Sequence, residues 1–98
     1  MNIFIAEDHK IVLDGYKLML KSSKAININK ILDFNNVDDA YQYLNKSQED
    51  SIDLGIFDYS MPASNQYKIK NGVDLSLFFK KKHPNARVII LTSHSTPL

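Results

Sequence analysis

Residues 53–62 of the chain read DLGIFDYSMP. Within this stretch an apolar run, Leu54 to Phe57, ends directly on the acid Asp58, and Met61-Pro62 interrupt the chain shortly afterwards. Burying an unpaired carboxylate is costly, so a buried strand ends on an acid where a cation or a reaction uses the charge. The stretch therefore predicts a buried strand that delivers Asp58 to a functional site.

Two other apolar runs, residues 3–6 and 87–92, have the continuous pattern of strands that are covered on both faces. A further strand is expected within residues 28–34, where the interspersed Lys30 and Asp33 indicate the edge of a sheet. Segments with helical periodicity separate these strands. The alternation predicts an α/β fold, a doubly wound parallel sheet with right-handed crossovers.

Three helices are expected between the strands, and they begin near Lys10, Asn36 and Gly72. Asn36 is expected to cap the second helix, and the third must end before Pro84. The first helix is expected to have one apolar face, made of Ile11, Val12, Gly15, Tyr16, Met19 and Leu20.

The composition is that of one small globular domain. The chain has 98 residues and a formal net charge of +1. This small charge does not indicate a protein that binds the phosphate backbone of nucleic acids. The three lysines 80–82 fit the solvated end of a helix better than a basic patch. There is no cysteine, and no apolar run approaches the ~20 residues that span a bilayer. A soluble cytoplasmic protein without a membrane partner is therefore expected.

Polar groups follow three of the expected strands at their carboxyl ends, where open α/β sheets bind ligands. They are Glu7-Asp8, Asp58 and Thr92-Ser93. Three carboxylates in one pocket repel one another, and Mg²⁺, which prefers oxygen ligands, would relieve this repulsion. Asp58 is then a candidate nucleophile that forms an acyl phosphate, and the Thr92 hydroxyl is a candidate sensor of phosphoryl oxygens. Taken singly, the same groups also fit a helix N-terminus, a turn cap and a plain strand end.

The constellation resembles the receiver domain of bacterial response regulators, the CheY-like fold with strand order 2-1-3-4-5. The resemblance covers the whole chain, residues 1–98. The matching motifs are the acidic pair Glu7-Asp8, the phosphoacceptor Asp58 in its D-x-x-M-P segment (residues 58–62), Asn71-Gly72 at the start of the third helix, and Thr92-Ser93.

The resemblance implies that Mg²⁺ is held by Glu7, Asp8, Asp58 and the backbone carbonyl of Ser60. It implies a phosphohistidine on a sensor histidine kinase as the phosphoryl donor. Such a domain is a phosphoacceptor signalling switch that assists its own phosphoryl transfer, and it is not a conventional enzyme. The segment AEDHK, residues 6–10, resembles the subfamily with a LuxR-type helix-turn-helix output, although His9 equally fits an ordinary first-turn residue. Transcription is the output implied, with DNA contacted only through an output domain outside this chain.

Two features depart from the family pattern. Residues 63–71 form an insertion beside Asp58, and their polar composition predicts a mobile surface loop, although a lid or a partner-contact loop is also possible. The chain stops at Leu98, where the family continues with a helix, a fifth strand carrying a lysine, and a last helix. We therefore expect a fragment of a longer regulator. Its strand 87–92 would be an exposed apolar edge, which predicts a homo-oligomer of this chain.

Two alternatives compete with a phosphorylatable receiver. A pseudo-receiver, which acts as a protein-interaction module without phosphorylation, is favoured by the missing lysine. A phosphatase with an aspartyl nucleophile would need a second acid two residues after the first, where Ser60 stands.

Overall fold

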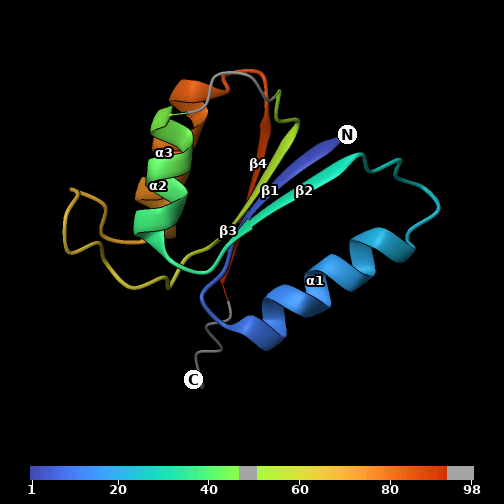
Figure 1. The fold of residues 1–98 in the computed structure, drawn as a ribbon, viewed down its shortest axis with the longest axis horizontal. Helices are drawn as coiled ribbons and strands as arrows, with labels where there is room; N and C mark the ends of the chain where they lie inside the picture. Colours follow the sequence, from blue (N-terminus) through green and yellow to red (C-terminus); the bar gives the residue numbers. More distant parts are fainter. Residues whose placement is uncertain (47–50, 93–98) are drawn as a thin grey trace.

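The computed structural model describes residues 1–46 and 51–92 of the chain. Within these residues, strands and helices alternate along the sequence (Figure 1). The elements are β1 (Asn2–Ala6), α1 (Lys10–Ser22), β2 (Lys30–Phe34), α2 (Val37–Lys46), β3 (Leu54–Asp58), α3 (Gly72–Lys82) and β4 (Arg87–Leu91). None of these helices has the length and apolar content needed to cross a lipid bilayer.

The four strands form one parallel sheet in the order β2-β1-β3-β4, as the sequence predicts. Helix α1 lies on one side of the sheet, and α2 and α3 lie together on the other (Figure 1). The register pairs Ala6 of β1 with Phe57 of β3, so these two central strands end at the same level. The residues that follow them, Glu7 and Asp58, are therefore brought to the same end of the sheet.

Each face of the sheet has its own apolar core. On the face under α2 and α3, the fully buried Phe4 lies 5.2, 5.7 and 5.3 Å, between ring centroids, from Phe34, Phe57 and Phe79. Truncating one buried phenylalanine typically costs about 3–5 kcal/mol, so this cluster holds β1 and β3 firmly at the centre of the sheet. The smaller core under α1 consists of Ile3, Ile5, Leu13 and Ile56.

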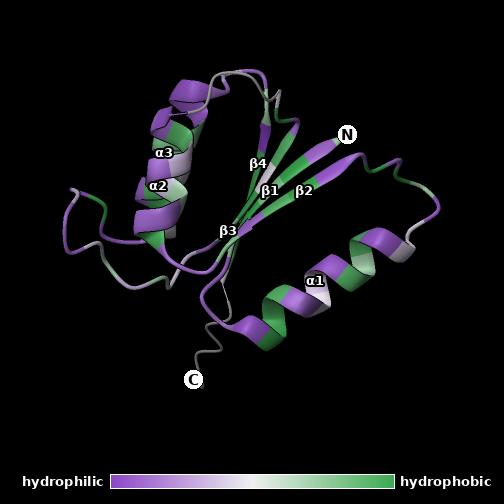
Figure 2. Ribbon diagram, viewed as in Figure 1, coloured by the Kyte–Doolittle hydropathy of each residue, from purple (hydrophilic) through white to green (hydrophobic). Residues whose placement is uncertain are grey.

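The prediction of which residues of α1 face the sheet is wrong for part of the set. The buried residue of this helix is Leu13, and Tyr16 and Leu20 pack beside it, whereas Ile11 is 87% exposed and Met19 is 69% exposed. Hydrophobic residues are spread around much of the helix, so their periodicity does not single out the face that meets the sheet (Figure 2). An ion pair helps to fix the rotation of α1, because the Lys17 ammonium lies 2.9 Å from Asp33 on β2.

Both helices on the other face begin with an asparagine cap. The Asn36 side chain accepts a hydrogen bond from the N–H of Asp39 at 2.7 Å, as expected for α2. The Asn71 side chain accepts one from the N–H of Asp74 at 3.0 Å in α3. Such caps satisfy backbone donors that lack a partner within the helix, and each contributes about 1 kcal/mol.

The insertion makes specific contacts with the helices, which its polar composition did not predict. The Ser64 N–H donates to the Ile69 carbonyl at 2.9 Å and closes the loop on itself. The Ser64 hydroxyl accepts hydrogen bonds from the N–H groups of Gln66 and Tyr67, and it donates to the Asp38 carboxylate of α2. Ile69 is only 6% exposed. Ser64, a polar residue that composition alone would place in solvent, therefore helps to hold the loop in place.

An aromatic contact completes the attachment of the insertion. The ring of Tyr67 stacks on Tyr41 of α2 with the centroids 4.0 Å apart, and Gln42 donates to the Tyr67 hydroxyl at 3.3 Å. Tyr41 stacks in turn on Phe78 of α3 at 4.5 Å. This row of rings ties the insertion to both helices.

Candidate functional site

The acids at the ends of β1 and β3 form a cluster. Glu7 and Asp58 are 3% and 4% exposed, and Asp8 is half-buried beside them. One ligand atom each from Glu7, Asp8, His9 and Asp58 lies within 4.8 Å of the others. The structure thus brings together the three carboxylates that the strand ends pointed to, and it adds a histidine.

His9 interacts directly with two of these carboxylates. Its Nδ1 lies 3.1 Å from Glu7 Oε2 and 3.3 Å from Asp8 Oδ1, and its backbone N–H donates to Glu7 Oε2 at 3.0 Å. The Nδ1 contact with Glu7 is a hydrogen bond, whereas Asp8 Oδ1 is buried and has no hydrogen-bond partner among the described residues. No definite role for His9 could be predicted from the sequence, and its position next to the acidic pair was the available signal.

The electrostatics of the cluster favour a cation. Burial raises the pKa of Glu7 above its ordinary value of 4.5, the hydrogen bonds from His9 oppose this change, and the negative charges of Asp58 and Asp8 add to it. The hydrogen bond to Glu7 and the charge of Asp8 raise the pKa of His9 above 6.5. Both pKa values rise for different reasons: burial is the main cause for Glu7, and the neighbouring carboxylates are the cause for the exposed His9.

Among the residues that the structure describes, the carboxylate of Asp58 makes only long hydrogen bonds. The Ser60 hydroxyl lies 3.3 and 3.4 Å from its two oxygens, and the Ser60 N–H lies 3.4 Å from Oδ1. An N–H···O bond is most often about 2.9–3.0 Å long, so these contacts leave much of the acceptor capacity of the carboxylate available. Asp58 is therefore placed in the cluster without being neutralised by its neighbours.

The backbone around Asp58 is held by β4 and α3. The Tyr59 N–H donates to the Leu91 carbonyl at 2.9 Å, and the Gly72 N–H donates to the Tyr59 carbonyl at 3.1 Å. A Cβ atom at position 72 would overlap the carbonyl oxygen of Asp58. Gly72 thus has a packing role beside Asp58 that its position in the sequence did not reveal by itself.

Thr92 directly follows β4 and is exposed. Asp58 pairs in register with Leu91, which places Thr92 one residue beyond the level of Asp58 on the neighbouring strand. Ser93, the other residue of the expected pair, lies outside the described residues.

The donor set fits a hard divalent cation. Carboxylate oxygens are the ligands that Mg²⁺ and Ca²⁺ prefer, and in the described part of the chain Asp8 Oδ1 is a buried oxygen that lacks the partner such groups normally have. A cation would also offset the mutual repulsion of Glu7, Asp8 and Asp58.

Comparison with known proteins gives the chain its family. Residues 3–97 match the family described as "Response regulator receiver domain". The transcriptional regulatory protein RcsB of Salmonella typhi is 30% identical over 97 residues, which are 99% of this chain and 41% of RcsB. The putative two-component response regulator ARR13 of Arabidopsis thaliana is 33% identical over 87% of this chain and 15% of its own length.

A solved structure with the same fold is RcsB of Salmonella enterica serovar Typhimurium, bound to promoter rprA in the presence of the phosphomimetic BeF3⁻. Its TM-score is 0.71 at 29% identity, and the alignment covers 99% of this chain and 72% of that one. Of the full RcsB sequence, which is longer than the solved chain, this chain spans 41%. With its strand order and its cluster of acids at the carboxyl ends of β1 and β3, the chain belongs to the receiver domains of two-component response regulators.

Proposed function

We propose that Asp58 accepts a phosphoryl group from the phosphohistidine of a sensor histidine kinase in the cytoplasm, and that this modification switches a transcriptional output. One observation carries the proposal, namely that Asp58 lies within a buried cluster of three carboxylates at the carboxyl ends of neighbouring central strands. A purely structural carboxylate would be paired with a cation or strongly hydrogen-bonded, and within residues 1–46 and 51–92 Asp58 makes only long hydrogen bonds to Ser60.

The reaction follows from the placement of the Asp58 carboxylate. One of its oxygens attacks the phosphorus atom and forms a new P–O bond. The P–N bond of the phosphohistidine breaks, and its electron pair stays on the departing imidazole. The product is an acyl phosphate on Asp58, a recognised use of aspartate as a nucleophile. Glu7 and Asp8 lie beside it, and the Thr92 hydroxyl, directly after the neighbouring strand β4, would donate a hydrogen bond to a phosphoryl oxygen.

The residues that would hold Mg²⁺ are Glu7, Asp8, Asp58 and, through its backbone carbonyl, Ser60. When bound, Mg²⁺ supplies positive charge that offsets the negative charge of the phosphoryl oxygens. This positive charge would also reduce the repulsion between the Asp58 carboxylate and an anionic donor.

The output of the proposed switch lies outside the chain. The relative RcsB is described as a transcriptional regulatory protein, and its solved structure was obtained with promoter DNA. Because the chain aligns with 41% of RcsB, we infer that DNA would be contacted by a part that this chain does not contain. The receiver would change that part's activity through its phosphorylation state.

Intact-mass spectrometry after incubation with acetyl phosphate tests the proposal. We expect a phosphoryl adduct on the wild-type chain that requires Mg²⁺ and is absent from Asp58→Asn. The matched control is Asp14→Asn, since Asp14 is an exposed acid on α1 whose ion-pair partner is Lys10. This variant should be modified as efficiently as the wild type.

Equal incorporation in Asp58→Asn would show that another residue is the acceptor. If the wild-type chain takes up no phosphate although it is folded and Mg²⁺ is present, the pseudo-receiver alternative replaces the proposal. In that case the acidic cluster would have no role in phosphorylation, and the domain would act through protein contacts alone.

A further inference from the structure

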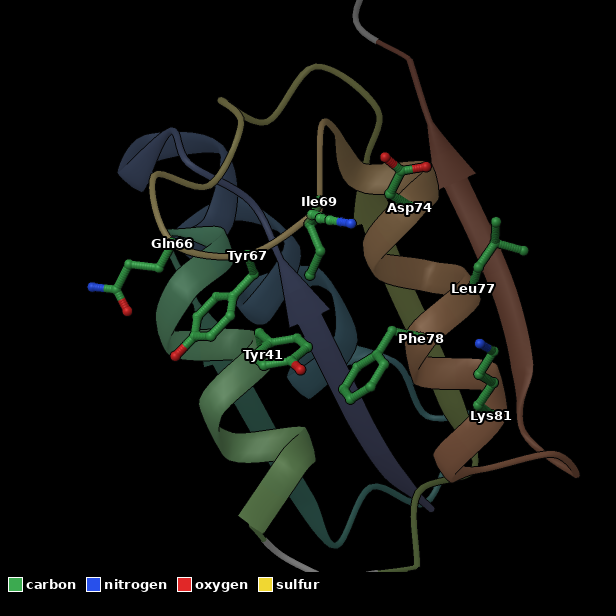
Figure 3. Close-up of a pocket in the computed structure, with 9 residues that line it drawn as sticks. Tyr41, Gln66, Tyr67, Ile69, Asp74, Leu77, Phe78 and Lys81 are labelled. Atoms are coloured by element: carbon green, nitrogen blue, oxygen red, sulfur yellow. The ribbon is translucent and has the colours of Figure 1, made fainter.

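A groove of about 550 Å³ lies where the insertion meets α2 and α3 (Figure 3). This volume is within the range of about 300–1,000 Å³ that ligand pockets occupy. Neither Asp58 nor the acidic cluster lines the groove, so it is separate from the proposed phosphorylation site. Its walls include Tyr41 from α2, Tyr67, Lys68 and Ile69 from the insertion, and Leu77 and Lys81 from α3.

The apolar part of the groove is a row of rings with aliphatic side chains beside it. Figure 3 shows Tyr67, Tyr41 and Phe78 side by side between the insertion and the two helices. Tyr41 stacks on both of the other rings, at 4.0 and 4.5 Å between centroids. Leu77 is 61% exposed at the edge of the groove. This surface suits an aliphatic or aromatic side chain that packs against ring edges and methyl groups.

The charged part of the groove is basic. Lys68 and Lys81 line it and are exposed, and the Lys82 ammonium lies 5.5 Å from the centroid of the Phe78 ring. Among the residues that the structure describes, none of these lysines forms an ion pair. The acid in the wall is Asp74, whose carboxylate already accepts the N–H of Lys70 at 2.9 Å. With two lysines and one acid among its lining residues, the groove carries an excess of positive charge.

We propose that this groove docks an acidic peptide segment of a partner protein. An aliphatic or aromatic side chain of the segment sits against Tyr67, Ile69 and Leu77, and its carboxylates face Lys68 and Lys81. Charge complementarity identifies the occupant, because the groove combines an apolar surface with an excess of lysine over acid among the residues that line it. The insertion supplies one wall, so the groove gives this receiver a contact surface of its own that is independent of Asp58.

A single-stranded nucleic acid fits the same surface less well. Bases bind such proteins by stacking on open aromatic faces. Here Tyr41 already stacks on two neighbouring rings. The groove is thus better suited to side chains than to bases.

Fluorescence anisotropy with a defined probe tests the proposal. The probe is a fluorescein-labelled peptide with a central Phe-Leu pair flanked by glutamates, and the comparison peptide carries lysines in their place. We expect the folded 98-residue chain to bind the acidic peptide, and Lys81→Glu to weaken binding about three- to tenfold. The matched control is Lys21→Glu, because Lys21 is also an exposed lysine in the last turn of a helix, α1. It should leave the affinity unchanged.

Tyr67→Ala should also weaken binding. Because this change could also disturb the fold of the loop, Lys81→Glu, which lies on α3, tests the groove independently. Amide resonances of Tyr67, Ile69 and Leu77 should shift in ¹⁵N spectra when the peptide is added, and those of Glu7 and Asp58 should not. Binding of both peptides alike, equal weakening by Lys21→Glu, or preference for an oligothymidine strand would overturn the proposal. Absence of binding by the wild-type chain at millimolar acidic peptide would overturn it as well.

Discussion

The backbone of Gly72 packs so closely against Asp58 that a Cβ atom at position 72 would overlap the Asp58 carbonyl oxygen. The Gly72 N–H also donates to the Tyr59 carbonyl at 3.1 Å. The start of α3 is thereby fixed against the residue that we propose as phosphoacceptor. Any side chain at this position would push the helix start and the end of β3 apart.

Gly72→Ala should therefore destabilise the chain and reduce phosphorylation. Overpacking of this kind costs about 1–3 kcal/mol, and we expect a lower free energy of unfolding in urea together with less adduct on Asp58. Gly15→Ala is the control, since a Cβ at this helical glycine meets no atom within 4 Å. It should raise the free energy of unfolding by about 0.5–1 kcal/mol. A Gly72→Ala chain as stable and as readily modified as the wild type would contradict the packing role.

The sheet and the position of Asp58 could be predicted from the sequence because a strand that is buried on both faces consists of a continuous run of apolar residues. The run Leu54 to Phe57 is apolar on both faces of β3, and the acid that ends it stands out. The Asn36 cap was also predictable, because an N-cap involves residues only three positions apart.

Contacts between distant segments could not be predicted in the same way. The contact of Ser64 with Asp38 and the stacking of Tyr67 on Tyr41 join residues 26 positions apart, and composition alone marks such residues as solvent-facing. The face of α1 was mistaken because Ile11 is as apolar as Leu13. The burial of Leu13 and the pairing of Lys17 with Asp33 show which side meets the sheet.

Shortening the insertion should preserve the metal site. Residues 65–68 can be removed where Ser64 and Ile69 already share a hydrogen bond, so that these two residues become neighbours. The proposed Mg²⁺ ligands lie elsewhere, and calorimetric titration should give a similar Mg²⁺ affinity. A loss of more than about tenfold, or about 1.4 kcal/mol, would show that the loop belongs to the site.

The anchor of the insertion should instead affect stability. Ile69 is 6% exposed, and Ile69→Ala should lower the free energy of unfolding by about 2–5 kcal/mol, measured in urea. Gln66→Ala is the control, because Gln66 is exposed and takes part through its backbone N–H. A neutral Ile69→Ala variant would indicate a loop that is detached in solution.

Stability without metal should fall as His9 loses its proton. The pKa of His9 is raised above 6.5 by Glu7 and by the charge of Asp8, so the folded chain binds this proton more tightly than the unfolded chain. The resulting stabilisation is complete below pH 6.5 and is lost as the pH rises through the raised pKa.

Urea unfolding in EDTA, below pH 6.5 and at alkaline pH, measures this effect. The wild type should lose stability relative to His9→Ala between the two conditions. Excess Mg²⁺ should reduce the difference, since the cation would supply positive charge beside Glu7, Asp8 and Asp58. A gap between the two chains that is the same at both pH values would contradict the argument.

The 98-residue chain should self-associate through β4. Within the described residues β4 is an edge of the sheet, and its Ile89 is 44% exposed. Beside it lies an apolar groove of about 400 Å³, lined by residues that include Tyr16, Ile56 and Leu91. Unpaired backbone groups next to an apolar surface are a template for pairing with a second chain.

Sedimentation velocity should therefore show a dimer or larger species that grows with concentration. Ile89→Lys should shift the distribution towards monomer, because a lysine on an edge strand opposes such pairing. Leu77→Lys, a matched change at an exposed leucine of α3, should leave it unchanged. A wild-type chain that stays monomeric at millimolar concentration would refute the argument from the edge.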